Sequence, residues 1–319
     1  MIQELGLTKD SFVIEVASND GYLLKNFVAE GIPCLGIEPT TSTAEAAVKI
    51  GVPVLQEFFG EVLGKKLAEE GRQADLIVCK NVYAHVPDIN DFTRGLRQVL
   101  KVGGTITIEF PHLMQLVLHN QFDTVYHEHF SYLTLLSVSR IFAAEGLRVF
   151  KVEELTTHGG SLRVYGCHAE DLRKTTDSVA TMLVSEEEHG LKSLTTYRDF
   201  QIKADRIKDS LLSFLIEQKR VGKSVVAYGA AAKGNTLLNY GGVKPDLLEF
   251  VCDAAMAKQG KFMPGSHIPI RPPSELFIST PDFVLILPWN IADEVQAQLF
   301  ELGEKGTKFV TVIPRLSVS

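Results

Sequence analysis

The fold class of this 319-residue chain is decided by Phe12-Val13-Ile14-Glu15-Val16-Ala17-Ser18-Asn19-Asp20-Gly21. A strand-like apolar run ends there in a cluster of turn residues, and residues 22–29 follow with helical periodicity. A second strand-like run, 33–38, ends on Glu38, an acid 23 positions after Glu15. This layout predicts a nucleoside-binding Rossmann unit in which Glu38 bonds a ribose diol. The alternative for Glu38 is a solvated acid at a strand end.

The loop after the first strand favours S-adenosylmethionine over a dinucleotide as the cofactor. It lacks the G-x-G-x-x-G fingerprint that brings a backbone against a pyrophosphate, and Asp20 would repel such a group. S-adenosylmethionine has no phosphate and carries a positive sulfonium and amine, which suit an acidic loop. Asp20 is otherwise a turn or N-cap residue. The predicted cofactor-binding residues are Glu15, Ser18, Asn19, Asp20, Gly21, Tyr22, Leu23, Glu38, Pro39, Asn81 and Val82.

Two histidines, His85 and His112, follow later strands at their carboxyl ends, where open α/β sheets place ligands. Each alone is more often structural, and the pair favours a site. Gly159-Gly160 either approaches a ligand or makes a turn. The elements expected in this half are strands over 75–79 and 105–110, a helix over 91–100 stopped by Gly103-Gly104, a helix over 133–145, and a strand pair over 148–152 and 161–167.

The block Asn120-Gln121-Phe122-Asp123-Thr124-Val125-Tyr126-His127-Glu128-His129-Phe130-Ser131-Tyr132 holds two histidines, two tyrosines and two carboxylates. A core segment would not use these side chains, because each needs a partner when buried. Histidine titrates near pH ~6.5, so the block favours acid–base chemistry. In a helix Tyr126 and His129 would share a face, and in a strand His127 and His129 would. The alternatives are a structural turn or a metal site, although H-E-x-x-H is absent.

The second half predicts another α/β unit. Residues 171–221 are charged and helically periodic without a strand signal, and they indicate helices that bridge two domains. A strand-turn-helix follows over 224–236, with Lys233 at a possible phosphate cradle. Trp289 leaves a buried strand over 283–287, either to stack on a base or sugar or to anchor a domain interface. The expected division is 1–168 for the cofactor domain, 169–222 for the helical connection and 223–319 for the second domain.

Composition excludes several classes of protein. Hydrophobic residues make up 45% and charged residues 22%, as in an ordinary globular protein. The net charge of −7, without a basic run, argues against nucleic acid or an anionic membrane as a partner. No apolar stretch reaches the roughly 20 residues of a membrane span, and no signal peptide is evident. The four cysteines are far apart, which predicts reduced thiols in a cytoplasmic protein without zinc. The oligomeric state stays open, and a monomer fits the sequence.

Several motifs together resemble a known family. The chain is similar to the S-adenosylmethionine-dependent C-methyltransferases of nucleotide-linked deoxysugars, which methylate C3 of TDP-4-keto-hexoses. The similarity covers nearly the whole chain. Members of the family usually carry a cysteine-rich zinc-binding domain, and this chain has no cysteine cluster. The motifs are Glu15-x-x-Ser18-Asn19-Asp20-Gly21, His85-Val86-Pro87-Asp88, Glu109-Phe110-Pro111-His112, the 121–132 block, His158-Gly159-Gly160-Ser161-Leu162-Arg163, Ala232-Lys233-Gly234-Asn235-Thr236, Lys258-Gln259-Gly260 and Pro288-Trp289-Asn290.

This resemblance implies roles for particular residues. The general base of the family matches His129, aided by Tyr126 and Glu128, and His85 matches another active-site histidine. A second Rossmann-like domain would follow the methyltransferase domain, with a TDP-linked sugar bound between the two. The residues expected to bind this substrate are Tyr83, His112, His158, Gly159, Lys233, Asn235, Trp289 and Asn290.

The expected chemistry is methylation of a carbon beside a ketone, which needs a base of near-neutral pKa and donors for an enolate oxygen. Two other functions compete with this one. The first is a non-catalytic module that binds S-adenosylmethionine or a sugar nucleotide. The second is a nicotinamide-dependent oxidoreductase, against which the absent glycine fingerprint argues.

Overall fold

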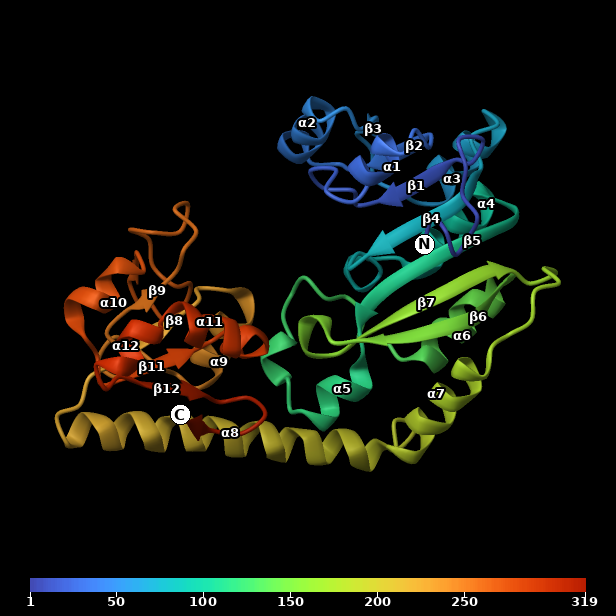
Figure 1. The fold of residues 1–319 in the computed structure, drawn as a ribbon. Coiled ribbons are helices and arrows are strands. Elements are labelled where there is room, and N and C mark those ends of the chain that lie inside the picture. Colours follow the sequence, from blue (N-terminus) through green and yellow to red (C-terminus); the bar gives the residue numbers. More distant parts are fainter. The chain divides into compact units, whose positions relative to one another are not determined.

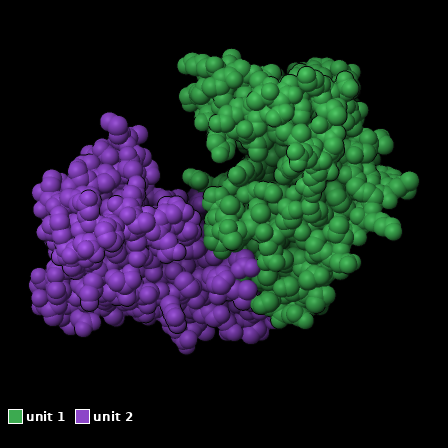
Figure 2. All heavy atoms as spheres, in the orientation of Figure 1, with its two compact units in different colours: residues 1–114, 128–191 green, residues 115–127, 192–319 purple.

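The computed structural model describes residues 1–319 and divides into two compact units. Unit 1 comprises residues 1–114 and 128–191, and unit 2 comprises residues 115–127 and 192–319 (Figure 2). The chain therefore leaves unit 1 after Met114 and returns to it at Glu128. These boundaries differ from the predicted domain ends at residues 168 and 222. The functions predicted for each domain remain predictions.

Unit 1 contains a seven-stranded sheet in the order β3-β2-β1-β4-β5-β7-β6 (Figure 1). Its first five strands pair in parallel, and β7 is antiparallel to β5 and β6. The strands are β1 (Val13–Val16), β2 (Cys34–Ile37), β3 (Val54–Leu55), β4 (Ala74–Lys80), β5 (Leu100–Pro111), β6 (Leu147–Leu155) and β7 (Ser161–His168). The helices are α1 (Lys25–Ala29), α2 (Thr41–Lys49), α3 (Glu61–Glu69), α4 (Ile89–Val99), α6 (Leu135–Ala144) and α7 (Asp177–Glu188).

Unit 2 contains a six-stranded sheet in the order β10-β9-β8-β11-β12-β13, parallel except for β13. The two sheets confirm the predicted α/β class, with one Rossmann-like sheet in each unit. The strands are β8 (Val225–Tyr228), β9 (Val251–Cys252), β10 (Ile270–Arg271), β11 (Phe283–Ile286), β12 (Lys308–Thr311) and β13 (Ser317–Val318). The helices are α8 (Leu194–Arg220), α9 (Ala232–Tyr240), α10 (Ser274–Ser279), α11 (Ala292–Gln298) and α12 (Phe300–Glu304), and α5 (Leu113–Leu118) spans the crossing between units.

The register of β1 gathers the loops that carry the predicted cofactor residues. All four residues of β1 are buried, and Val16 pairs with Ile37 on β2 and with Cys79 on β4. The three strands are parallel, so their carboxyl ends meet at one edge of the sheet. The loop after β1, Glu38 after β2 and Asn81 after β4 therefore leave the sheet at this edge.

Two predicted element boundaries are wrong. Helix α4 ends at Val99 and β5 begins at Leu100, so Gly103-Gly104 lie inside the strand and do not stop the helix. Helix α1 begins only at Lys25, because residues 21 and 22 belong to the turn that follows β1.

No helix of the structure is both long and apolar enough to cross a membrane, including the 27-residue α8. The four cysteines, Cys34, Cys79, Cys167 and Cys252, are buried free thiols.

Candidate active site

A cavity of about 400 Å³ opens at the edge of the unit 1 sheet where β1 and β4 end. Most of the residues predicted to bind the cofactor line it. Asp20, Gly21, Glu38 and Pro39 do not line it, whereas Ala17 and Lys80 line it without having been predicted. The lining residues are Glu15, Ala17, Ser18, Asn19, Tyr22, Leu23, Lys80, Asn81, Val82 and His85.

Glu15 is the acid at the centre of this cavity. It lies inside β1, is 5% exposed, and its Oε2 atom has no hydrogen-bond partner. Burial raises the pKa of its carboxyl to about 8, against the opposing charge of Lys80 and with a smaller contribution from Asp20. Burying an unpaired carboxylate is costly, so Glu15 favours a cationic partner in the cavity.

The loop after β1 adopts a conformation that only particular residues tolerate. Ala17 and Asn19 have positive φ angles of 60° and 50°, which cost an alanine about 1–2 kcal/mol. A Cβ on Gly36 of β2 would lie 2.4 Å from Ser18 Oγ, so only glycine lets this loop sit against the strand. Ser18 Oγ is itself buried without a hydrogen-bond partner. The strain and the unpaired hydroxyl make this loop a candidate for ligand binding.

Glu38 does not line the cavity, but it bonds the backbone of the loop that does. Its side chain is buried, and its two carboxylate oxygens accept the backbone N–H groups of Asn19 at 3.1 Å and Thr40 at 2.9 Å. Each carboxylate oxygen can accept a further bond, so this position leaves capacity for a ribose hydroxyl. Asp20 accepts the N–H of Tyr22 at 3.2 Å, as expected of a turn residue.

Asn81 extends the polar rim of the cavity. It has a positive φ of 52°, and its backbone N–H donates to the Glu109 carbonyl at 2.9 Å. Its side-chain Nδ2 lies 2.8 Å from Nε2 of His158, which also has a positive φ, of 56°. The Oδ1 atom of Asn81 is buried and lacks a partner.

The unpaired atoms around the cavity are three oxygens that can accept hydrogen bonds, Glu15 Oε2, Ser18 Oγ and Asn81 Oδ1. They lie beside small and flexible side chains and suit a ligand with an ammonium group, a sulfonium group and hydroxyls. No residue of a phosphate-binding glycine loop lines the cavity. The residues present thus fit S-adenosylmethionine.

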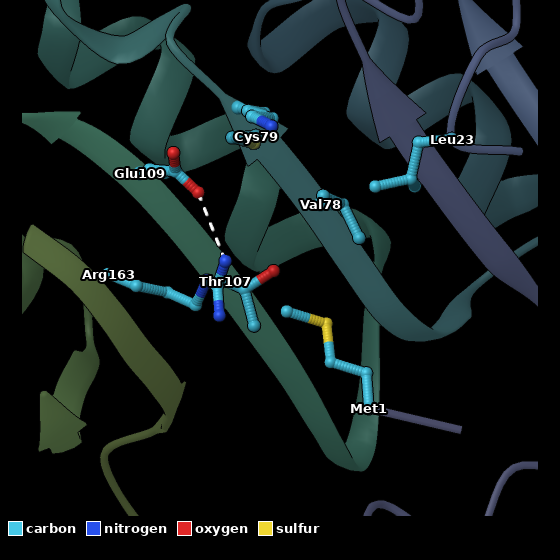
Figure 3. A pocket seen from close by; sticks show the side chains of 8 residues that line it. Met1, Leu23, Val78, Cys79, Thr107, Glu109 and Arg163 are labelled. Atoms are coloured by element: carbon cyan, nitrogen blue, oxygen red, sulfur yellow. Dashed lines mark hydrogen bonds and ion pairs between the residues drawn. The ribbon is translucent and has the colours of Figure 1, made fainter. Parts of the chain in front are cut away.

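A second cavity of about 50 Å³ lies against β4 and β5 and shares Leu23 and Lys80 with the first one. Figure 3 shows Met1 and Val78 on one side of it and the ion pair between Arg163 and Glu109, 3.2 Å apart, on the other. This cavity is too small for a cofactor, and its ion pair braces β5 against β7.

His129 lies beside His85, which lines the cavity of about 400 Å³. The centroids of the two imidazole rings are 4.7 Å apart, and Tyr132 stacks edge-on against His129 at 5.8 Å. The backbone fixes this arrangement, because the Ala84 carbonyl accepts the N–H groups of Phe130 at 2.9 Å and Ser131 at 3.2 Å. The structure thus brings together the two histidines that the sequence had only placed in separate motifs.

The block that carries His129 is neither helical nor extended. A short 3₁₀ turn, Phe122–Thr124, is followed by irregular chain with a turn at His127 and Glu128. Neither of the two face-sharing arrangements considered for Tyr126, His127 and His129 is therefore correct. Tyr126 and His127 belong to unit 2, whereas Glu128 and His129 belong to unit 1.

Two residues predicted to bind substrate are buried and bonded to other side chains of unit 1, and their role in substrate binding stays a prediction. Tyr83 is fully buried, packs on Phe92 and Phe142, and bonds Thr93 Oγ1 at 2.6 Å. His112 is 1% exposed, and its Nε2 lies 2.8 Å from Glu186, whose carboxylate also accepts the first N–H groups of α6. Both follow strands whose ends lie at the site, which made them resemble site residues in the sequence.

Unit 2 joins three of the predicted residues in one polar cluster. Lys233 Nζ donates to Asn290 Oδ1 at 2.7 Å and lies 4.4 Å from the ring centroid of Trp289. Burial lowers the pKa of Lys233, and Asp123 partly opposes this. The Trp289 indole N–H donates to Asp123 Oδ2 at 2.7 Å. The sequence did not single out Asp123, although it lies among the polar residues of the 120–132 block.

A cavity of about 330 Å³ in unit 2 lies beside the start of α9. It takes in Asn235, which was predicted to bind substrate, and two lysines, Lys258 and Lys261. Lys258 Nζ donates to the Ala230 carbonyl at 2.9 Å and pairs with Asp253 at 3.1 Å. The Met263 and Ile270 side chains provide apolar walls. In residues 1–319, no group of three or more His, Cys, Asp or Glu side chains is arranged to hold a metal ion.

Comparisons with known proteins cover both units. The family model for a methyltransferase domain matches residues 2–152, and the model for a C-methyltransferase C-terminal domain matches residues 156–314. The C-methyltransferase NovU of Streptomyces niveus is 34% identical over 313 residues, which is 98% of this chain and 74% of NovU. A ubiquinone biosynthesis O-methyltransferase of Escherichia coli is 28% identical over 98 residues, which is 30% of this chain and 40% of that protein.

Solved structures resemble about half of the chain. The YcgJ protein of Bacillus subtilis has a TM-score of 0.42 and 14% identity, and covers 53% of this chain and 97% of its own. The magnesium protoporphyrin IX methyltransferase of Synechocystis, solved with bound S-adenosylmethionine, has a TM-score of 0.37 and 12% identity, and covers 49% of this chain and 69% of its own.

Proposed function

The chain belongs to the S-adenosylmethionine-dependent C-methyltransferases, and from this premise we propose that it methylates C3 of a nucleotide-linked 4-keto-deoxysugar. The observation that carries the proposal is the placement of His129 beside His85, which lines the cofactor cavity. This contact supports a base and a second imidazole beside the cavity proposed for the methyl donor.

His129 is the proposed base. The C3–H bond of a 4-keto sugar is acidic because the electron pair can move onto the ketone oxygen. A neutral imidazole accepts that proton, and the substrate becomes an enolate. The docking of Phe130 and Ser131 onto the Ala84 carbonyl restricts the backbone beside His129, which supports the positioning that such a step needs.

The negative charge on the enolate oxygen needs hydrogen-bond donors. We assign this role to the O–H group of Tyr126, three residues before His129 in the chain, and to an N–H group of His85, whose ring lies beside that of His129. Glu128, which adjoins His129 in the chain, balances the charge of the imidazolium that forms. Among the predicted catalytic residues, His85 and His129 contact each other through their rings.

S-adenosylmethionine, when bound, supplies an electrophilic methyl carbon whose bond to sulfur breaks with its electron pair on sulfur. The residues that would hold it are Glu15 and Asn81 through their unpaired oxygens, and Glu38 through the ribose. Because S-adenosylmethionine has no phosphate, the loop after β1 does not have to bind one. The C3 electron pair of the enolate then forms the new carbon–carbon bond, and the ketone is restored.

Unit 2 is the proposed binder of the nucleotide part. Its cavity of about 330 Å³ combines two lysines with apolar walls, which suits a diphosphate joined to a base. Lys233 adds a cation in a separate cluster of the same unit, where its Nζ lies over the Trp289 ring. The two lysines of this cavity, Lys258 and Lys261, support a nucleotide-linked rather than a free sugar as substrate.

A transfer assay tests this function. The protein is incubated with methyl-labelled S-adenosylmethionine and a panel of TDP-4-keto-deoxysugars, and carbon NMR locates the label. We expect label at C3 of one sugar. Label on oxygen would contradict C-methylation of this substrate. Binding of both ligands without transfer would favour the non-catalytic alternative.

A further inference from the structure

The segment 115–127 is anchored on unit 2 by contacts of three kinds. Phe122 is 7% exposed within the apolar core of unit 2, with its ring centroid 5.2 Å from that of Tyr240. Asn120 Nδ2 donates to the Pro314 carbonyl at 3.3 Å. The third contact is the 2.7 Å bond from the Trp289 indole to Asp123 Oδ2. The segment is thus an integral part of unit 2, although its neighbours in sequence belong to unit 1.

Asp123 is an unusual choice for an anchor. It is 0% exposed, its Oδ1 atom has no hydrogen-bond partner, and burial raises its pKa to about 6 although Trp289 and Lys233 act in the opposite direction. An asparagine has nearly the same volume and could accept the same indole N–H without the cost of burying a charge. The bond to Trp289 therefore needs an acceptor oxygen at this position rather than a negative charge.

Asp123 lies three residues before Tyr126, and the backbone between them is closed by local bonds. The N–H groups of Thr124 and Val125 donate to the carbonyls of Gln121 and Phe122, each at 3.0 Å. After His127 the chain re-enters unit 1, where Phe130 and Ser131 are bonded to Ala84. The residues 126–129 are therefore a short link with a fixed point at each end.

We propose that Asp123, through its bond to Trp289, is a positioning residue that sets the backbone of residues 126–129 for proton abstraction. This inference rests on the proposed function, because it assigns Asp123 no contact with substrate. The bond fixes the unit 2 end of the link, and the Ala84 bonds fix the unit 1 end. Loss of either end would let Tyr126 and His129 drift from the reacting carbon while both ligands still bind.

The test measures exchange of the C3 proton of a TDP-4-keto-deoxysugar in heavy water without a methyl donor. Trp289→Phe keeps an aromatic ring beside Lys233 but removes the indole donor, and Asp123→Leu removes the acceptor. We expect each to lower the maximal exchange rate by about tenfold to a hundredfold, with little change in the half-saturating sugar concentration. Asp123→Asn is the matched control. It should retain most of the wild-type exchange rate, because its side-chain carbonyl oxygen can accept the same hydrogen bond from Trp289.

The affinity for S-adenosylmethionine and the thermal midpoint are measured on every variant. Wild-type exchange rates in folded Trp289→Phe and Asp123→Leu would overturn the positioning role, as would a parallel loss of cofactor affinity. Absence of exchange in the wild type would instead contradict the proposed function itself.

Hydrogen–deuterium exchange of the backbone provides a readout that does not depend on activity. Peptides that cover residues 120–130 should lose protection in Trp289→Phe and keep it in Asp123→Asn. Trp289 is also the only tryptophan, so its fluorescence reports on the bond directly. The wild-type emission should change with a midpoint near pH 6, and this change should be absent from Asp123→Asn. Unchanged protection of residues 120–130 in Trp289→Phe would overturn the inference, whatever the pH at which Asp123 titrates.

Discussion

Binding of S-adenosylmethionine should release a proton from Glu15. The pKa of this buried carboxyl is raised to about 8, so at pH 7 about 0.9 of the molecules carry the proton before the cofactor binds. A sulfonium and an ammonium group in the cavity favour the ionised form, because opposite charges attract strongly where water is excluded. Ionisation on binding therefore couples cofactor affinity to pH.

The size of this effect follows from the pKa. If only the ionised form binds, the association constant is proportional to the ionised fraction, which is about 0.01 at pH 6 and about 0.09 at pH 7. Affinity should then rise about ninefold between these values, close to 1.3 kcal/mol. The rise should level off above pH 8. Below pH 7 the α-amino group of the cofactor remains mostly protonated, so it contributes little to this slope.

Isothermal titration calorimetry at pH 6 and pH 7 measures both the affinity and the released proton. Repeating the titration in buffers of different ionisation enthalpy gives the number of protons directly. Glu15→Gln is the control, because its amide fills the same space without titrating in this range. The variant should bind with an affinity that hardly changes with pH. A wild-type affinity that is flat between pH 6 and pH 7, with no proton released, would refute the role given to Glu15.

Three further changes test separate parts of the structure. Glu38→Ala should weaken S-adenosylmethionine binding by roughly 1–3 kcal/mol, because it removes a charged acceptor and frees the Asn19 loop; an unchanged affinity in calorimetry would remove Glu38 from the site. Tyr83→Phe should destabilise the protein by about 1 kcal/mol in urea unfolding without changing the KM for the sugar, since its hydroxyl bonds only within the core; a raised KM would return Tyr83 to the substrate site. For Asp123 the native pKa of about 6 lies above the unfolded value, so the native state binds the extra proton and stability is lost as pH rises from about 4 to 6. Relative to wild type, Asp123→Asn should thus gain about 2.4 kcal/mol of unfolding free energy between pH 4 and pH 7, and an equal pH dependence of both proteins would contradict the assignment.

The sequence was informative wherever the signal was local. The strand Val13–Val16, its turn and Glu38 could be placed because hydrophobic runs, turn residues and a strand-end acid lie within 30 residues of one another. The strand ends of β4 and β5 could be predicted for the same reason. His85 and His129 were both chosen, but only the docking of residues 130 and 131 onto Ala84 explains why they meet.

Other features depended on long-range packing. Tyr83 and His112 follow strands at the ligand edge, and nothing in their spacing shows that Thr93 and Glu186 draw them into the core. The passage of residues 115–127 into unit 2 has no local signal, because it depends on the pocket that receives Phe122 and on the distant Trp289. Asp123 was overlooked for this reason: its partner lies 166 residues away.

The measurement that tests the central claim most directly is proton exchange at C3 in His129→Asn. A TDP-4-keto-deoxysugar is incubated with the protein in heavy water without a methyl donor, and proton NMR follows the C3 signal. The wild type should exchange this proton, and His129→Asn should abolish exchange while its affinity for S-adenosylmethionine stays nearly the same, because a base acts on the transition state rather than on cofactor binding. Exchange that persists in His129→Asn and vanishes in His85→Asn would move the base to His85. Exchange that persists in both variants would contradict the histidine-base mechanism.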